Sequence, residues 1–209
     1  LRRSACRRAQ SSTAITNGFD AGGRITKAYD TSDRRYTYTY TTLDSVVRLT
    51  EVKAETKTGG TWGGTPTGLS TVAQVDYSYY GTSESEGSVG DLKQVTRTTP
   101  LTDSGVLLVQ KKHYRYWLET YSGSNHGFAH AIKYIYDYEG VRRFDWQDST
   151  FDDDHLTASA SSLLPYATAS FEYGADYRIS LAWFNGECGC SSGASNGTFE
   201  FEYENNASF

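Results

Sequence analysis

The 209-residue chain has no methionine and only three prolines. Because proline is scarce, turns must be made by Gly, Asn, Asp and Ser, and 20 glycines are available for them. Methionine is missing even at position 1, so we expect both ends to be cut points in a longer polypeptide. No apolar run approaches the roughly 18 residues that a membrane-spanning helix needs, so we expect no membrane span.

Cysteine and positive charge are also limited. Three cysteines cannot all pair within the chain, and Cys188 and Cys190 are close for an unstrained bridge to each other. The net charge of −5 argues against a general nucleic-acid binder. The opening LRRSACRRAQ is basic, but no apolar segment follows it, so it is not a secretory signal. We expect residues 1–14 to be a solvated, disordered end, with phosphate binding as the alternative.

Aromatic residues are abundant instead, with 17 Tyr, 9 Phe and 4 Trp. Tyr, Phe, Trp, Thr and Val favour half-buried pleated surfaces. A tyrosine ring can pack while its hydroxyl stays in water. The composition therefore predicts a mainly β protein, and the length suits one large domain or two small ones.

Aromatic residues alternate with polar ones in several segments. In residues 34–56, Tyr36, Tyr38 and Tyr40 alternate with threonines, which places the rings on one face of a strand. Similar aromatic strands and Gly-, Ser- or Asn-rich turns lie within 74–98, 111–146, 169–184 and 197–205. The aromatic positions of these segments are Tyr77, Tyr79, Tyr114, Tyr116, Tyr134, Tyr136, Phe171, Tyr173, Phe199 and Phe201.

The aromatic strands recur at a regular spacing. Tyr77 and Tyr114 are 37 residues apart, as are Tyr134 and Phe171, whereas Tyr114 and Tyr134 are 20 apart. A unit of roughly 20 residues fits a strand–turn–strand module, which is marginal alone and needs neighbours to bury its aromatic face. Such a period is typical of an array in which each unit packs on the next.

The segment NGFDAGGRITKAYD (17–30) has the sequence of one such hairpin. Phe19 and Asp20 open the turn, Gly23 ends it, and Arg24 begins the return strand. Partial copies are Arg48-Leu49-Thr50, preceded by Asp44, and Arg178-Ile179-Ser180, preceded by YGAD; a more distant copy is Gly90-Asp91-Leu92.

These motifs resemble the YD-repeat, or Rhs, family, whose theme is a Tyr/Phe-Asp pair, a turn ending in Gly-Arg and an aliphatic-Thr strand. The segments YRYW (114–117) and AHAIKYIYDYEGVRRF (129–144) are similar to a common bacterial subgroup. The resemblance covers most of residues 15–206. It implies a very long sheet of hairpins wound spirally into a hollow shell, which encloses a C-terminal toxin or effector in secreted bacterial proteins or stands at the cell surface.

The resemblance sets our expectations for this chain. We expect tandem antiparallel β-hairpin repeats that form part of a large curved or spiral sheet, with units near 17–56, 74–101, 111–146 and 169–206. An insertion at 147–166 would carry one short helix near 155–164. The expected partners are neighbouring repeats of the same polypeptide and an enclosed effector, and the expected location is secreted or at the cell surface.

Three motifs suggest metal ligands, but each has a simpler interpretation. His126 and His130 are four apart, yet the zincin pattern needs a Glu where Gly127 stands. The acidic DSTFDDDH (148–155) lacks the calcium-loop spacing and favours a helix start. Cys188 and Cys190 have no second pair, so a tight turn is the simpler interpretation. We therefore assign no metal or cofactor.

The alternative function is a carbohydrate-binding, adhesin-like module that stacks sugars on exposed aromatic rings. We name Trp62 and Trp146 as its possible contacts. No GxSxG elbow or other catalytic constellation is present, so the sequence predicts no enzymatic activity.

Overall fold

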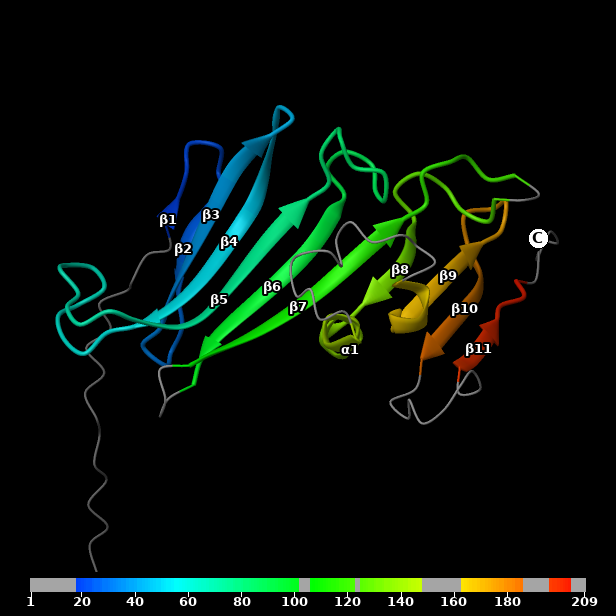
Figure 1. The fold of residues 1–209 in the computed structure, drawn as a ribbon. Helices are drawn as coiled ribbons and strands as arrows, with labels where there is room; N and C mark the ends of the chain where they lie inside the picture. The colour runs from blue at the N-terminus through cyan, green and yellow to red at the C-terminus, as the bar shows by residue number, and fades with distance from the viewer. Residues whose placement is uncertain (1–17, 102–105, 123–124, 148–162, 186–195, 204–209) are drawn as a thin grey trace, which may run out of the picture.

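The structure is a computed structural model that describes residues 18–101, 106–122, 125–147, 163–185 and 196–203. Eleven strands and one α-helix follow one another along this part of the chain (Figure 1). The strands are β1 (Gly18–Phe19), β2 (Ile25–Tyr29), β3 (Arg35–Leu43), β4 (Val46–Thr56), β5 (Ser70–Tyr79), β6 (Leu92–Pro100), β7 (Leu107–Tyr116), β8 (Ile132–Tyr136), β9 (Ala169–Tyr173), β10 (Ile179–Asn185) and β11 (Asn196–Glu200). Between β8 and β9 lie the helix α1 (Tyr138–Gln147) and a 3-10 turn, η2 (Leu164–Tyr166).

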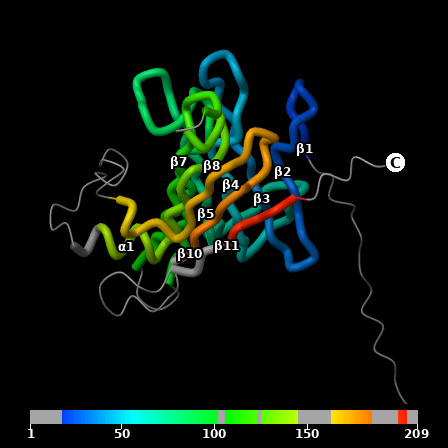
Figure 2. Tube along the Cα trace, turned by 90° about the vertical axis from the view of Figure 1, so that its right-hand side faces the viewer, coloured from blue at the N-terminus to red at the C-terminus, as the bar shows by residue number. Residues whose placement is uncertain are grey.

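All eleven strands form one antiparallel sheet, and their order in the sheet is their order in the sequence. The sheet is open, with β1 at one edge and β11 at the other (Figure 1). In Figure 2, β1 and β11 lie to the right of β7 and β8, whereas α1 lies to the left, so the sheet curves away from α1. The expectation of a mainly β protein with an antiparallel sheet is confirmed, whereas its organisation as tandem hairpin repeats stays a prediction.

The Asp20 motif closes the β1–β2 connection. The backbone N–H of Asp20 donates to the carbonyl of Arg24 at 2.9 Å, and the N–H of Gly23 donates to the carbonyl of Asp20 at 3.0 Å. The Asp20 carboxylate accepts hydrogen bonds from the backbone of Gly22 and Arg24, both at 2.9 Å. Gly23 has φ +76°, a backbone conformation that glycine adopts without steric cost.

The same turn recurs after β2 and after β9. Asp30 takes the place of Asp20 and accepts from the backbone of Ser32 at 2.8 Å and of Arg34 at 3.1 Å, while Asp33 takes the positive-φ position with φ 59°. After β9, Gly174 donates to the carbonyl of Arg178 at 2.8 Å. There the positive-φ position is held by Tyr177.

The register of the strands defines two faces of the sheet, because residues opposite each other in paired strands point to the same side. We call one side the aromatic face: Tyr36, Tyr38, Val52, Ala54, Val75, Tyr77, Val95, Tyr114, Ile135, Ala169, Phe171, Ala182, Phe184 and Phe199. The opposite side is the polar face: Arg35, Thr37, Thr39, Glu51, Lys53, Glu55, Gln74, Asp76, Gln94, Thr96, His113, Arg115, Tyr134 and Tyr136. The alternation expected for Tyr36, Tyr38 and their threonine neighbours is therefore present.

A small hydrophobic core lies where α1 packs on the polar face. Tyr136 of β8, Val141 and Phe144 of α1, Leu163 and Ala167 are buried together, with Tyr134 and Tyr166 packed against them. A helix here buries its apolar residues at a spacing of three, which fits the i, i+3 pattern.

The position of the helix corrects the sequence interpretation. We assigned residues 111–146 to two aromatic strands and the turn between them, but the second strand ends at Tyr136 and residues 138–147 are helical. The cause is Asp137, whose carboxylate accepts the backbone N–H of Gly140 at 2.9 Å and so begins the helix. The helix expected at 155–164 lies almost entirely outside the described residues, as does the disordered end at 1–14.

Candidate functional site

Arg115 is the centre of the most buried polar cluster in the described residues. Its side chain has 0% exposure, and its guanidinium lies 3.1 Å from the carboxylate of Glu86, which is 33% exposed. Glu86 belongs to the β5–β6 loop, and its carbonyl accepts the backbone N–H of Tyr116 at 2.9 Å. The ion pair and this hydrogen bond together fasten the loop over β7.

Aromatic rings enclose His113, two residues before Arg115 on the same face. The His113 ring lies 5.8 Å from the ring of Tyr136 and 6.4 Å from that of Tyr80. Tyr80 donates its hydroxyl to the carbonyl of Tyr114 at 2.7 Å. Burial raises the pKa values of Tyr80 and Tyr136 far above the ordinary tyrosine value. Burial also raises the pKa of Tyr116 to about 12.

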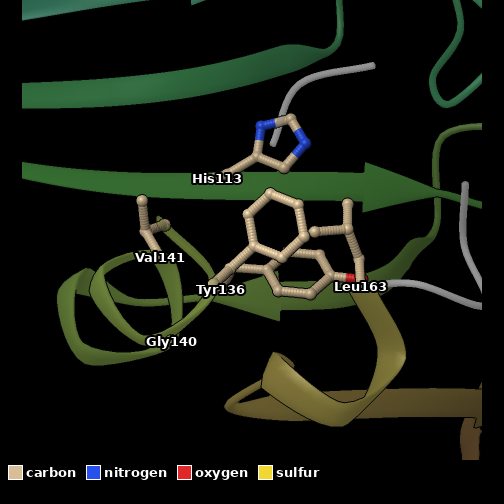
Figure 3. Close-up of a pocket in the computed structure, with 6 residues that line it drawn as sticks. His113, Tyr136, Gly140, Val141 and Leu163 are labelled. Atoms are coloured by element: carbon tan, nitrogen blue, oxygen red, sulfur yellow. The ribbon is translucent and has the colours of Figure 1, made fainter. Parts of the chain in front are cut away.

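A narrow crevice lies between this cluster and the helix. It is lined by His113, Tyr136, Gly140, Val141, Phe144 and Leu163. Figure 3 shows the rings of His113 and Tyr136 beside Val141 and Leu163. The crevice leaves no room for a water molecule, so it is a packing seam and cannot hold a substrate. The buried rings and the ion pair of this cluster therefore contribute to the stability of the fold.

Tyrosines at three strand ends fasten each strand to the one before it. Tyr79, the last residue of β5, donates its hydroxyl to the carbonyl of Leu49 in β4 at 2.7 Å. Tyr116 at the end of β7 donates to Leu92 of β6 at 2.9 Å, and Tyr173 at the end of β9 donates to Ile132 of β8 at 3.0 Å. The three bonds are equivalent in position, one for every two strands.

Irregularities in register lie beside three tyrosines of odd-numbered strands, Tyr40, Tyr79 and Tyr116. Register shifts occur between Thr39 and Tyr40 in β3, between Ser78 and Tyr79 in β5, and between Arg115 and Tyr116 in β7. A bulge at such a place increases the local twist of a sheet. These three irregularities lie toward the same end of the sheet, and a further one lies at the opposite end, between Ala54 and Glu55 of β4.

The aromatic face is most exposed beside β11. Phe171, Phe184 and Phe199 lie on three adjacent strands and make edge-to-face contacts, with ring centroids 6.0 Å and 5.6 Å apart. Phe184 is 42% and Phe199 56% exposed. This row of rings runs to the open edge of the sheet, which makes the edge a candidate surface for further association.

Two further aromatic motif residues, Tyr36 and Phe19, lie near the β1 edge of the sheet. Tyr36 donates its hydroxyl to Asp30 at 2.9 Å, which links strand to turn. Phe19, on the two-residue edge strand β1, is 63% exposed.

Gly90 and Asp91 close the long β5–β6 connection with the same backbone pairing as the shorter turns. Tyr80 donates its N–H to the carbonyl of Asp91 at 2.9 Å, and Gly90, with φ +87°, donates to the carbonyl of Tyr80 at 2.8 Å. Sequence reasoning missed Tyr80, whose position directly before this loop was the available signal.

Trp62 does not have the exposure that we expected of a glycan contact. It is 6% exposed, and its indole N–H donates to Asp33 at 2.7 Å. Tyr29, Arg35 and Lys57 pack around its ring. With no open ring face for a sugar, Trp62 is a structural residue in this fold. Trp146 lies on α1, and its side chain falls outside the described residues.

The histidines of HGFAH pair with different carboxylates. His126 Nδ1 lies 2.6 Å from Glu172, and His130 Nδ1 lies 2.8 Å from Asp91. Across the described ranges, no three His, Cys, Asp or Glu side chains are grouped as a metal site would require. The acidic segment at 148–155 and both C-terminal cysteines lie outside those ranges.

Comparisons with known proteins identify no relative: no family model, curated protein or solved structure matches this chain. The helix among the described residues is too short and too polar to cross a membrane.

Proposed function

We propose that this chain is a segment of the wall of an Rhs-like β-shell, in which consecutive hairpins extend one curved sheet. The observation that carries this proposal is the order of the strands: each of the eleven pairs only with its neighbours in sequence, and both edges stay open. A sheet built in this way can be lengthened by further hairpins at either edge without rearranging the strands already present.

Two repeated contacts support hairpin units as the building block. The turn of Asp20 and Gly23 recurs at Asp30 and Asp33. The tyrosine bond of Tyr79 recurs at Tyr116 and Tyr173. The turn holds the two strands of one hairpin together, and the tyrosine bond joins that hairpin to the hairpin before it. An array of hairpins that are only weakly stable alone needs both kinds of contact.

The β11 edge supports the proposal in more detail. Phe201 donates its N–H to the carbonyl of Ser180 in β10 at 3.0 Å, in the same register as the Phe199–Ala182 pair. Backbone N–H groups alternate in direction along a strand, so the N–H of Glu200 points away from β10. In the proposed wall, this group and the row of rings ending at Phe199 meet the next hairpin.

The shell would enclose an effector carried by the same polypeptide, in a secreted or surface protein. This role follows the YD-repeat resemblance of the motif around Asp20 and Arg24. The concave side of the sheet, opposite α1, would line the interior.

Sedimentation velocity tests the wall proposal, because an open edge should associate with other chains. We expect concentration-dependent oligomers of residues 1–209. Glu200→Pro removes only an outward N–H and should shift the chain toward monomer, since proline is tolerated at a sheet edge. Glu200→Gln, which changes charge and keeps the N–H, is the matched control and should still associate. A wild-type chain that stays monomeric at all concentrations would contradict the proposal.

A further inference from the structure

Beyond its role in the sheet, the chain carries a stack of aromatic rings where β7 and β9 end and β8 and β10 begin; its rings are half-buried except for Tyr177, which is exposed. Phe128, in the β7–β8 loop, lies 4.0 Å from Tyr177 with an interplanar angle of 21°. Tyr121 is also nearly parallel to Phe128, at 5.9 Å and 27°. Tyr173 of β9 meets Phe128 edge-on at 6.1 Å. The stack therefore brings together the β7–β8 loop, the β9–β10 loop and the end of β9.

Residues 125–127, directly before Phe128 in the loop, make several close contacts. Asn125 is 8% exposed and donates its side-chain amide to the carbonyl of Thr120 at 2.8 Å. The carbonyl of His126 accepts the N–H of Tyr173 at 2.8 Å, which ties the loop to β9. Gly127 packs so closely on the ring of Trp117 that a Cβ would lie 2.0 Å from it. Ordering of this loop on ligand binding would therefore cost little entropy.

Tyr177 is the outermost ring and the one that the fold least explains. It is 73% exposed and has φ 66°. Gly23 and Asp33 hold the same place in the equivalent turns. A tyrosine in this left-handed conformation costs more backbone free energy than glycine or aspartate. One face of its ring packs on Phe128, but most of its surface faces solvent.

Two pairs of polar side chains lie next to the stack residues in the sequence. His126 Nδ1 lies 2.6 Å from Glu172, and the Nε of Arg178 lies 3.4 Å from Asp176. These pairs supply hydrogen-bond donors and acceptors beside the rings. A polyhydroxylated ligand can use both the donors and the acceptors that these pairs offer.

From this geometry we propose that the stack of Tyr121, Phe128 and Tyr177 is a carbohydrate-binding site, in which a pyranose ring stacks on the open face of Tyr177. The apolar C–H face of a sugar adds one more layer to the stack, and its hydroxyls bond to Asp176 and the His126–Glu172 pair. A protein partner would need roughly 800 Å² of surface on each side, which a few rings do not offer. This site does not depend on the wall proposal.

The test is a titration with cellohexaose and, separately, chitohexaose, up to about 10 mM, because a single stacking site binds with a Kd on the order of millimolar. Saturation-transfer NMR would detect contact between sugar protons and aromatic protons. We expect binding of at least one of the two sugars to the wild-type chain. Failure of both sugars to bind would overturn the proposal.

Variants of one position identify the ring. Tyr177→Gly should fold, because glycine suits the positive φ, and should weaken binding at least tenfold. Tyr177→Phe keeps the ring and should bind within about threefold of wild type. Phe19→Ala removes another exposed ring, on β1, and should leave binding unchanged. Unaltered binding by a folded Tyr177→Gly chain would also overturn the proposal, whatever the outcome of the sedimentation experiment.

Discussion

The indole nitrogen of Trp62 donates a hydrogen bond to Oδ1 of Asp33 at 2.7 Å, which joins the β4–β5 loop to the β2–β3 turn. The same carboxylate accepts Lys57 Nζ at 2.9 Å. The Trp62 ring lies 6.0 Å from Tyr29 and 5.0 Å from the guanidinium of Arg35. One loop residue thus fixes the first strands of the sheet.

Trp62→Ala should therefore destabilise the fold and leave sugar binding intact. Removal of a buried Trp costs about 3–5 kcal/mol of unfolding free energy. Urea denaturation measures this loss, and the cellohexaose titration serves as its control. A stable Trp62→Ala chain that no longer binds sugar would show that Trp62 is a ligand contact and not a structural residue.

The turn aspartates predict an acid-labile fold. The Asp20 pKa is lowered chiefly by the hydrogen bond from the Arg24 backbone, and that of Asp33 chiefly by Lys57. Burial alone would raise the pKa of Asp30, but hydrogen bonds from Arg34, Tyr36 and Ser32 outweigh it and lower the value. A depressed folded pKa stabilises the protein above the unfolded pKa, about 3.9, and this contribution is lost as pH falls through the folded value.

The urea midpoint should accordingly fall as the pH drops below about 4. Asp30→Asn keeps an oxygen that can accept from the turn backbone but removes the charge, so the acid dependence should become shallower. A variant with the full wild-type pH dependence would show that Asp30 does not contribute through its charge.

The buried tyrosines predict a second loss of stability at alkaline pH. Burial raises the pKa of Tyr80, Tyr116 and Tyr136, so the folded state holds these protons more tightly than the unfolded chain. Their contribution is complete below the unfolded pKa of about 10 and decreases as pH rises beyond it. Absorbance at 295 nm should show late ionisation, and Tyr116→Phe should remove one group that titrates near pH 12 in the folded state. Simultaneous ionisation of all tyrosines near pH 10 in a folded chain would contradict this expectation.

The Arg115–Glu86 pair predicts which of two variants loses more unfolding free energy. Glu86→Gln leaves a fully buried guanidinium without its carboxylate, whereas Arg115→Met replaces the charge with an apolar side chain of similar length. We expect Glu86→Gln to lower the unfolding free energy more, by up to about 3 kcal/mol. Thermal unfolding of both variants checks the order, and the reverse order would show that Arg115 acts chiefly through other contacts.

Local patterns predicted the strands well, because alternation and turn chemistry act between near neighbours. The faces of Tyr36 and Tyr38, and the turn of Asp20 and Gly23, follow from these rules. The helix at Tyr138–Gln147 was missed because the aromatic motif before it continued the β pattern, although Asp137 with Val141 and Phe144 gave a helix-start signal.

Contacts between residues that are distant in the sequence could not be predicted from local patterns. Trp62 looked like an exposed ring because nothing local indicates the distant partners Asp33 and Arg35. The stack of Phe128 and Tyr177 joins loops on either side of the helical segment, so no sequence period connects them. The burial of Arg115 likewise depends on Glu86, in a loop far along the chain.

Electron cryomicroscopy of the full natural polypeptide that contains these residues tests the wall account most directly. We expect the strands to continue past β1 and β11 into further hairpins, as one curved sheet around a hollow interior with α1 on its outer side. A density in which the two edges are capped by other elements, with the sheet forming one layer of a solid domain, would contradict it.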